Sequence, residues 1–533
     1  MSTLPTRSLL EGERDLLHLS RRNFIKGTIA AFAAQPYARA VQLDSQNPVV
    51  FPGARAGGET SDTKMLQRAI DQAGEHGGGT VHIVPGRYLS GSLLLRSHVS
   101  LWLDSGATIV MSPDPAEFFP AEKPGYDPKT DQSTADFRHA LFAGDSIENV
   151  AIFGEGIIDC NRTKGGGPKP VALRRCSHVS LRGITIRSSP SYNISLLGCE
   201  FVTIDRVTIQ NGFSDGIDPD CSRYVTISNC FIESVDDAIV LKSSGALGEL
   251  KSTEYVTVDN CILRTASIHF KCGTESCGDF RNITVANCVF QGGMGMRHGN
   301  PGIALYTADG GTLENAAISN IVMRDVGTPI AILRNDRDRC ALGHGPGPLN
   351  SVHIANVIAT GAKLPSVIAG LPGAPVTGIY IEGLSVEMAD TGIATGIPET
   401  IPESPKQYPQ PTMFGPLPAF GLYLRHVSTI SLRDVELRAS TQEQRAAIVA
   451  DDVDTLQLLG YRDDGRKTGS HLWFNNLRDS LAECLFSFPP SPHSYRVSGR
   501  KTANLYFKGT GSFDWKQALL VDADVPRHAV HQQ

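Results

Sequence analysis

The sequence predicts a parallel β-solenoid with a helix over one open end, and three observations point to this fold class. A short phrase of alternating apolar and polar residues begins at Val179, Val202, Val225, Val256 and Ile283, in steps of 23, 23, 31 and 27 residues. No long helical pattern interrupts these phrases. An asparagine also recurs at one position of the phrase. A repeat period in the twenties with alternating apolar residues is typical of stacked β coils.

The repeated asparagines are expected to stack along the solenoid. Alternation sends Val225 and Ile227 inward and Thr226 outward. Stacked amides can hydrogen-bond from one coil to the next. A β-sandwich is the alternative architecture, but it needs hairpin turns and few Asn-Gly or Asp-Gly pairs fit between the strands. The expected amide ladder consists of Asn229, Asn260, Asn287, Asn320 and Asn356.

Residues 1–40 are expected to be a twin-arginine export signal. Ser20–Lys26 contains the arginine pair, a weakly apolar segment follows at Gly27–Ala34, and Ala38–Ala40 has the small-x-small pattern of a cleavage site. The mature protein would begin near Val41. These features predict a periplasmic or secreted protein.

Residues 41–110 are expected to form an N-terminal cap and the first strands. Met65–Ala73 places apolar or small residues on one helical face, Asp62 is a plausible N-cap, and Gly77–Gly79 would end the helix. A helix here would cover the apolar end of the terminal coil. Short strands are expected at 80–84, 92–95, 99–103 and 108–111.

Residues 111–460 are expected to hold the main β-helix, and 461–533 further short strands. Seven prolines between 398 and 418 cannot continue a hydrogen-bonded ladder, so this segment is predicted to be a long loop that contains Tyr408. Long ordered loops on a rigid scaffold often shape binding sites.

Composition excludes some function classes. The formal net charge of −6 gives no basic field for nucleic acid, and no apolar run reaches the roughly 18 residues of a membrane span.

Of the 11 cysteines, Cys230, Cys261 and Cys288 each end a near-identical phrase. A small apolar residue at one repeated position indicates a core ladder, so most cysteines are expected to be buried thiols.

Three carboxylates are predicted to meet on neighbouring coils. Asp215 lies two residues before Ile217, and Asp237 two residues before Ile239. Adjacent coils lie about 4.8 Å apart, so Asp215 and Asp237 should stack with Asp236 beside them. Three close carboxylates repel, and at least one pKa should rise. A glycosidase needs this combination of a protonated acid and an ionised base. Asp as a turn residue and a Ca²⁺ site are the alternatives.

The same alignment takes Ile217, Ile239, Ile268 and Ile303 as equivalent residues of successive coils. The residues three positions after them are expected to form one outer column. The residues one position after them include Asp218 and His269, with Val240 between them. The predicted column consists of Asp220, Lys242, Lys271 and Tyr306.

At these residues the sequence resembles family 28 of the glycoside hydrolases, the polygalacturonase family of right-handed parallel β-helices. Phe213–Asp218 matches the family motif Asn-Thr-Asp-Gly-x-Asp at its Asp, Gly and Asp, and Asp236-Asp237 follows Asp215 by 21 residues. The resemblance spans roughly residues 45–340. It implies inverting hydrolysis, with Asp236 as general acid and with Asp215 and Asp237 holding and deprotonating water.

The sequence departs from the family in two motifs. The family's Gly-His-Gly falls at Ser267-Ile268-His269, and its Arg-x-Lys falls at Ala304-Leu305-Tyr306. The family's histidine and its uronate-binding Arg-x-Lys pair are therefore both missing from their usual places. The candidates for substrate binding are Lys242, Lys271, His269, Glu275, Tyr306 and Arg334, with Arg337 and Arg425 as further arginines.

The resemblance implies a pectic or related plant-wall substrate that contains uronate, no cofactor or metal, and a monomer. The loop at 398–418 would close one end of the cleft, which favours exo action. Two alternatives remain: a polysaccharide lyase with Lys242 or Lys271 as the base and Ca²⁺ on the substrate acid, and a non-catalytic glycan-binding solenoid.

Overall fold

The computed structural model describes residues 49–51 and 61–532, apart from 123–124, 127, 129, 131–133, 135, 163, 341–344, 390–395, 442, 464–469, 484–485, 488–493 and 509–514. Residues 48–533 form one compact unit. The expected export signal at 1–40 lies outside the described residues. Within the described part, no helix is both long and apolar enough to cross a lipid bilayer.

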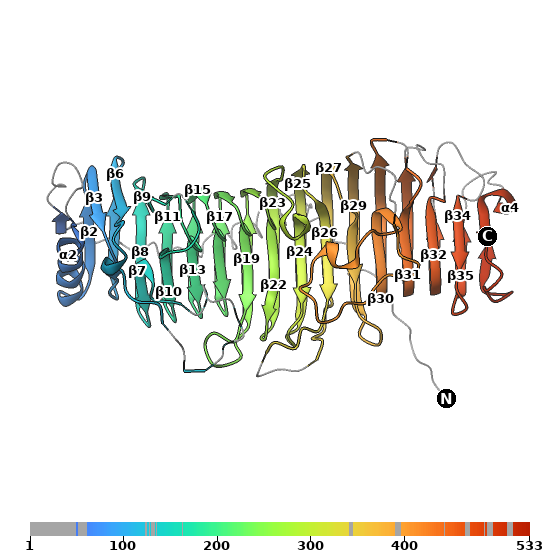
Figure 1. The fold of residues 1–533 in the computed structure, drawn as a ribbon, viewed down its shortest axis with the longest axis horizontal. Coiled ribbons are helices and arrows are strands. Elements are labelled where there is room, and N and C mark those ends of the chain that lie inside the picture. The colour runs from blue at the N-terminus through green and yellow to red at the C-terminus, as the bar shows by residue number, and fades with distance from the viewer. Residues whose placement is uncertain are drawn as a thin grey trace, which may run out of the picture. The chain divides into compact units, whose positions relative to one another are not determined.

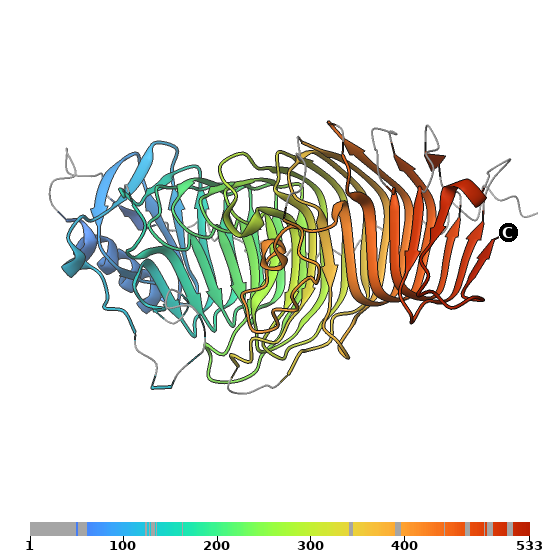
Figure 2. The same ribbon diagram turned by 45° about the vertical axis from the view of Figure 1, so that its right-hand side comes forward.

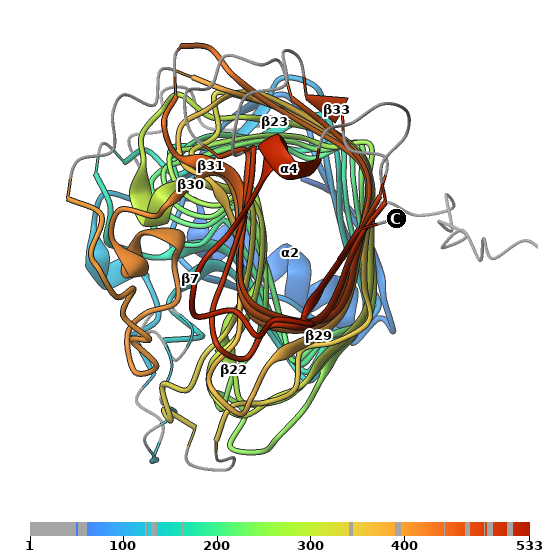
Figure 3. The ribbon, with the colours of Figure 1, turned by 90° about the vertical axis from the view of Figure 1, so that its right-hand side faces the viewer.

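The unit is a right-handed parallel β-helix, as predicted (Figure 1). Each coil pairs in parallel with the coil before it and the coil after it. One ladder runs through β11 (Ser177–Arg182), β14 (Glu200–Asp205), β17 (Arg223–Ser228), β20 (Thr253–Asp259) and β23 (Phe280–Gln291). Figure 3, which looks along the coil, shows the ring that the strands form.

The predicted register of this ladder is confirmed. Val179, Val202, Val225, Val256 and Ile283 pair in sequence from coil to coil. Their side chains are buried, and they alternate with exposed or half-buried neighbours. The period of two therefore sets the inner face of each coil because apolar side chains leave water there.

The asparagine ladder is confirmed at three of its four steps. The amide of Asn260 donates to Asn229 Oδ1 at 2.7 Å, Asn320 donates to Asn287 Oδ1 at 3.1 Å, and Asn356 donates to Asn320 Oδ1 at 3.1 Å. At the step between Asn260 and Asn287, the Asn287 amide donates instead to Asp259 Oδ1 at 2.8 Å. All five asparagines have φ between 53° and 57°. Asparagine tolerates this left-handed conformation better than most residues, and its amide bonds from coil to coil.

The N-terminal helix α2 (Thr63–Glu75) covers the first coil, as predicted. It buries Leu66, Ile70 and Ala73 against the core, and in Figure 3 it is visible through the ring at the far end. Asp62 is the N-cap residue, and its carboxylate accepts from the Leu89 backbone N–H at 3.2 Å. Gly77 follows the helix with φ of 87°, which suits glycine.

The first strands lie close to their predicted ranges. They are β2 (Gly79–Ile83), β4 (Leu93–Leu94), β5 (Val99–Leu103) and β6 (Ala107–Met111). One further strand, β3 (Gly86–Ser90), lies outside the predicted ranges. Strands also fill the C-terminal tail, where β32 (Leu472–Glu483), β34 (Tyr495–Ser498) and β36 (Leu519–Val521) extend the ladder.

Most described cysteines are buried thiols, as predicted, but two form a disulfide. Eight are free and buried. Cys277 and Cys340 form a disulfide across 63 residues of sequence. Neither residue belongs to the repeated phrase that suggested thiols. They lie in connections between strands, where sequence alone does not indicate which segments meet.

Two apolar clusters lie on the coils outside the main core. The N-side cover consists of Phe137, Ala140, Ala143, Ala172, Leu197, Cys221 and Leu247. The C-side cover consists of Ile268, Ala304, Tyr306, Ala331, Leu333, Val367, Ala369, Phe414, Leu417, Ala419, Tyr423, Ala446 and Val449. The proline-rich loop contributes to the C-side cover through η3 (Pro411–Phe414), and Figure 2 shows this orange loop lying across the yellow-green coils.

Candidate active site

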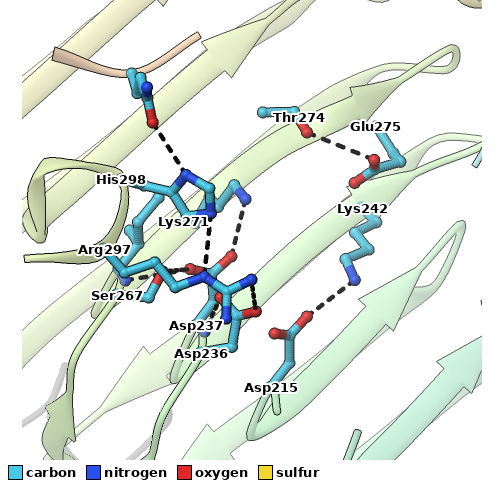
Figure 4. A network of polar contacts seen from close by, with 12 residues as sticks. Asp215, Asp236, Asp237, Lys242, Ser267, Lys271, Thr274, Glu275, Arg297 and His298 are labelled. Atoms are coloured by element: carbon cyan, nitrogen blue, oxygen red, sulfur yellow. Dashed lines mark hydrogen bonds and ion pairs between the residues drawn. The ribbon is translucent and has the colours of Figure 1, made fainter. Parts of the chain in front are cut away.

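Three carboxylates meet where two neighbouring strands begin. Asp215 precedes β16 (Ile217–Asp220), and Asp236 and Asp237 precede β19 (Ile239–Ser243). Ile217 pairs with Ile239, so Asp215 and Asp237 hold the same position on adjacent coils, as predicted. One oxygen from each of the three lies within 4.8 Å of the others (Figure 4).

Gly216 lets the two coils approach at this point. Its N–H donates to the Asp237 carbonyl at 2.8 Å. A Cβ on residue 216 would lie 2.3 Å from the Ala238 carbonyl oxygen, which is too close for any side chain. The Asp-Gly sequence therefore has a structural cause: glycine allows the Asp215 backbone to sit directly against the Asp237 coil.

Lys242 holds Asp215 in a buried ion pair. Its Nζ lies 3.0 Å from Asp215 Oδ2 and 2.8 Å from Asp218 Oδ1, and it sits 3.9 Å from the centre of the Tyr192 ring. Burial acts to lower the lysine's pKa, but Asp218 and Asp215 outweigh it and hold that pKa well above its ordinary value. Burial raises the pKa of Asp215, although Lys242 opposes this rise.

Lys271, on β22 (Phe270–Ser276), holds Asp237 in a second buried ion pair. Its Nζ lies 2.8 Å from Asp237 Oδ2 and 2.9 Å from the Tyr408 hydroxyl. The Ser267 hydroxyl donates to Asp237 Oδ1 at 2.7 Å, and the Ile268 N–H donates to the same oxygen at 3.1 Å. Burial acts to raise the Asp237 pKa, but Lys271 and these donors together lower it.

Asp236 differs from its neighbours in both exposure and charge. Its side chain is 17% exposed, against 6% for Asp215 and 5% for Asp237. Arg297 Nη2 lies 2.9 Å from Asp236 Oδ2. Burial and the adjacent Asp237 raise the Asp236 pKa, and Arg297 opposes this rise. Asp236 is therefore the carboxyl that reaches solvent with a raised pKa, beside a carboxyl whose pKa is lowered.

Sequence reasoning missed a second row of contacts at this site. His298 Nδ1 lies 3.0 Å from Gln410 Oε1, and Arg297 Nε donates to His298 Nε2 at 3.4 Å. The His298 ring stacks on Tyr408 with 4.7 Å between centroids. Tyr408 of the proline-rich loop thus contacts Lys271, the partner of Asp237, and Gln410 of the same loop reaches Arg297, the partner of Asp236, through His298. Tyr408 had been singled out within the loop, but the glycine-rich segment around Arg297 and His298 matches no repeat.

The predicted column of lysines and tyrosine is wrong beyond its first pair. Asp220 does pair with Lys242. However, Ile239 pairs with Phe270 and not with Ile268, so Lys271 stands opposite Val240. On the next coil Lys271 pairs with Ala304, so Tyr306 lies outside the column as well. Ile268 and Phe270 are both apolar and two residues apart, so alternation alone cannot decide which of them pairs with Ile239.

Two predicted substrate-binding residues are buried and correct the sequence interpretation. His269 is fully buried, with Nδ1 3.0 Å from the Pro301 carbonyl and its ring stacked on Phe290. Tyr306 is fully buried in the C-side cover. Neither side chain is positioned to touch a substrate.

The other predicted binding residues hold loops or lie behind the carboxylates. Arg334 donates to the carbonyls of Pro346 and Pro375, so it is committed to loop structure. Glu275 is buried near Lys242 and Lys271, both of whose pKa values it helps to raise.

The two further arginines are also committed. Arg337 pairs with Asp309, and Arg425 pairs with Glu403 of the proline-rich loop.

The charges argue against two alternatives. A lyase base must be neutral near physiological pH, but the pKa values of Lys242 and Lys271 are both raised well above their ordinary value by the carboxylates they contact. A Ca²⁺ ion would have to compete with Lys242, Lys271 and Arg297, each of which already pairs with an oxygen of one of the three carboxylates. Two surface cavities lie on either side of Arg445, and the three carboxylates line neither.

Comparisons with known proteins show which proteins this chain is similar to. The family model described as glycosyl hydrolases family 28 matches residues 125–395. A probable polygalacturonase of Vitis vinifera is 24% identical over 450 residues, which cover 76% of this chain and 90% of that protein. A polygalacturonase of Ralstonia nicotianae is 27% identical over 343 residues, covering 50% and 61%.

Solved structures share the fold. An exopolygalacturonase from Thermotoga maritima superposes with a TM-score of 0.55 at 24% identity, covering 69% of this chain and 91% of that one. A family 28 exopolygalacturonase of Yersinia enterocolitica gives 0.53 at 18% identity, covering 80% and 78%.

Proposed function

The chain belongs to glycosyl hydrolase family 28 and is an O-glycosyl hydrolase, and we propose that it cleaves polygalacturonate or a closely related pectic chain at Asp215, Asp236 and Asp237. The names of the relatives support the pectic substrate. The fold supports it less directly, because one fold hosts many substrates.

In this proposal Asp236 is the general acid. It is the carboxyl of the three that reaches solvent, and burial and Asp237 raise its pKa. A carboxyl that stays protonated can donate to the glycosidic oxygen as the bond breaks. Asp237 is ionised by its contact with Lys271 and deprotonates the attacking water, which Asp215 helps to orient.

The observation that carries the proposal is the different surroundings of two adjacent carboxyls: Asp236 reaches solvent, whereas Asp237 is buried against Lys271 and the Ser267 hydroxyl. Asp236 and Asp237 are neighbours in sequence, yet the pKa of one is raised and that of the other is lowered. A turn motif does not require one carboxyl with a raised pKa beside one with a lowered pKa. Acid–base catalysis needs one proton donor and one ionised partner at the same bond.

We further propose that cleavage occurs at a chain end. The N-side cover contains outward residues of β10 (Lys169–Arg174) and β13 (Ile194–Leu197), just before Asp215. The C-side cover contains outward residues of β24 (Pro301–Thr307) and β26 (Thr328–Arg334). Both covers reach the carboxylate coils, because Cys221 and Leu247 of the N-side cover follow β16 and β19 and Ile268 of the C-side cover precedes β22. The proline-rich loop also lies against the site, where the Tyr408 hydroxyl is 2.9 Å from Lys271 Nζ. Surfaces that close around the carboxylates favour a few sugar units over a long chain passing through.

The test is hydrolysis of polygalacturonate and of defined oligogalacturonides by the purified protein. We expect release of short products from the first time point with little loss of viscosity, which is the signature of exo action. Asp236→Asn should lower kcat about 10²- to 10⁴-fold, the usual contribution of a general acid. Turnover that survives this change on a verified substrate would remove Asp236 from the mechanism, and a rapid fall in viscosity would refute the exo proposal.

We also propose that residues 1–40 direct export to the periplasm or the outside of the cell, where a pectic polymer would be met. Residues 41–110 would then serve as the cap, 111–460 as the catalytic coils and 461–533 as the closing coils of a monomer. Fusion of residues 1–40 to a reporter, with Arg21 and Arg22 changed to Lys as the control, tests the export signal.

A further inference from the structure

Arg297 occupies a different position from the other two cations at the site. Lys242 and Lys271 are buried, and each contacts two polar partners that come from this chain. The Arg297 side chain is 50% exposed and pairs with Asp236, the carboxyl that also reaches solvent. Among the described residues that pair with the three carboxylates, Arg297 is therefore the cation that a substrate can reach.

The segment that carries Arg297 is fixed to the coil beneath it. The Arg297 N–H donates to the Ala266 carbonyl at 2.9 Å. Asn300, which is fully buried, donates from its amide to the carbonyls of Thr265 and Ser267 at 3.2 and 2.6 Å. The backbone around Arg297 is thus anchored to the strand end that also carries Ser267, a donor to Asp237.

The guanidinium itself is oriented from its far side. Gln410 Oε1 accepts from His298 Nδ1, which leaves His298 Nε2 to accept from Arg297 Nε. Tyr408 stacks on the same imidazole. This chain of contacts sets the plane of the fork and leaves its Nη side toward Asp236 and solvent. A planar, oriented guanidinium is well suited to bind a carboxylate through two parallel hydrogen bonds.

We propose that Arg297 is the receptor for a carboxylate of the substrate, and that it exchanges Asp236 for this carboxylate when the substrate binds. This inference rests on the proposed function, because it assigns specificity to the same site. In the free enzyme Arg297 balances Asp236. In the complex the substrate carboxylate takes that place, and Asp236 is left beside Asp237 and Asp215.

The exchange would favour the protonated form of Asp236, the proposed general acid. The groups that face Asp236 are Asp237, Asp215, Lys271, Arg297 and the hydroxyl of Ser267. Arg297 is one of the groups that hold its pKa down, and an incoming carboxylate adds negative charge nearby. Asp236 then takes a proton from solvent on the oxygen that Arg297 has left. A sugar that carries a carboxylate would in this way promote the protonation of Asp236, which then donates to the glycosidic bond of that sugar, and a neutral sugar would not.

The experiment compares trigalacturonate with its fully methyl-esterified form, using Arg297→Gln, Arg297→Lys and the wild type. Arg297→Gln should lower kcat/KM for the acid about 10- to 100-fold, the usual worth of a hydrogen bond to a charged group, and change the ester less than about threefold. Arg297→Lys should recover part of the loss, because it keeps the charge but not the fork. Arg324→Gln, at a 77% exposed arginine paired with the adjacent Asp325, is the matched control.

The pH profiles separate recognition from support of the fold. In the wild type the alkaline limb should lie at higher pH in kcat than in kcat/KM, because kcat reports the complex and kcat/KM the free enzyme. In Arg297→Gln the kcat/KM limb should move up, since a cation that lowers the Asp236 pKa is gone. Equal losses on acid and ester, or limbs that coincide in the wild type, would overturn the proposal.

Failure of the inference and failure of the proposed function give different results. If the wild type cleaves neither substrate, the proposed function fails. Calorimetric binding of trigalacturonate alone then judges Arg297: weaker binding by Arg297→Gln than by Arg324→Gln supports the receptor role, and equal binding refutes it. Matching far-UV circular dichroism and unfolding midpoints establish that the variants are folded.

Discussion

Replacing Lys271 by methionine should disable Asp237 and destabilise the protein at neutral pH. Methionine keeps most of the volume of the lysine stem but removes the charge. Asp237 would lose the ammonium at 2.8 Å, and Tyr408 would lose its partner at 2.9 Å. The side chains of Lys271 and Asp237 are only 4% and 5% exposed, so water cannot replace the missing charge without rearrangement.

The size of the effect follows from this burial. Removing one partner of a buried ion pair leaves an uncompensated charge and costs about 3–5 kcal/mol of stability. The Asp237 pKa is lowered in the folded state, so its stabilising contribution is present above the unfolded-state pKa and is lost as pH falls through the folded value. In Lys271→Met that pKa rises. The stability gap to the wild type should therefore be widest near neutral pH and narrow in acid.

Urea unfolding at several pH values measures the gap, and the pH profile of kcat measures the loss of the base. The acid limb of kcat should move to higher pH, because Asp237 now protonates more easily. Lys406→Met is the control, since its ammonium lies 3.1 Å from Asp336 but the side chain is 59% exposed, and exposed pairs contribute about 0–1 kcal/mol. A Lys271→Met protein with wild-type stability and an unmoved acid limb would refute the idea that Lys271 keeps Asp237 ionised.

Three further predictions concern the stereochemistry, the metal requirement and the amide ladder. We expect the first product to have inverted anomeric configuration in a proton NMR time course, because Asp237 and Asp215 are assigned to water; retention would make one of them a nucleophile. A chelator should leave turnover unchanged, since three cations of the chain already neutralise the carboxylates, and loss of activity restored by Ca²⁺ would contradict this. Asn260→Ala should cost about 1–2 kcal/mol in urea unfolding, and Asn260→Gly less, because residue 260 has φ of 53° and glycine tolerates it; equal costs would assign the effect to the lost amide alone.

Periodicity in the sequence is enough to predict the coil and the place of the acidic cluster. The phrases at Val202, Val225 and Val256 fix which side chains point inward, because a slip of one residue would expose every apolar one. Once Ile217 and Ile239 are in register, Asp215 and Asp237 must stack. Local alternation and a constant strand spacing are sufficient for this part of the site.

Tertiary structure alone decided which groups surround these carboxylates. Ile239 pairs with Phe270 and not with Ile268, and this offset of two residues moves Lys271 out of the predicted column and opposite Val240, where it contacts Asp237. Tyr408 reaches Lys271 across 137 residues of sequence. Arg297 and His298 come from a connection with no repeat. Loops meet at a site according to the path of the chain in space, and no periodic signal in the sequence records that path.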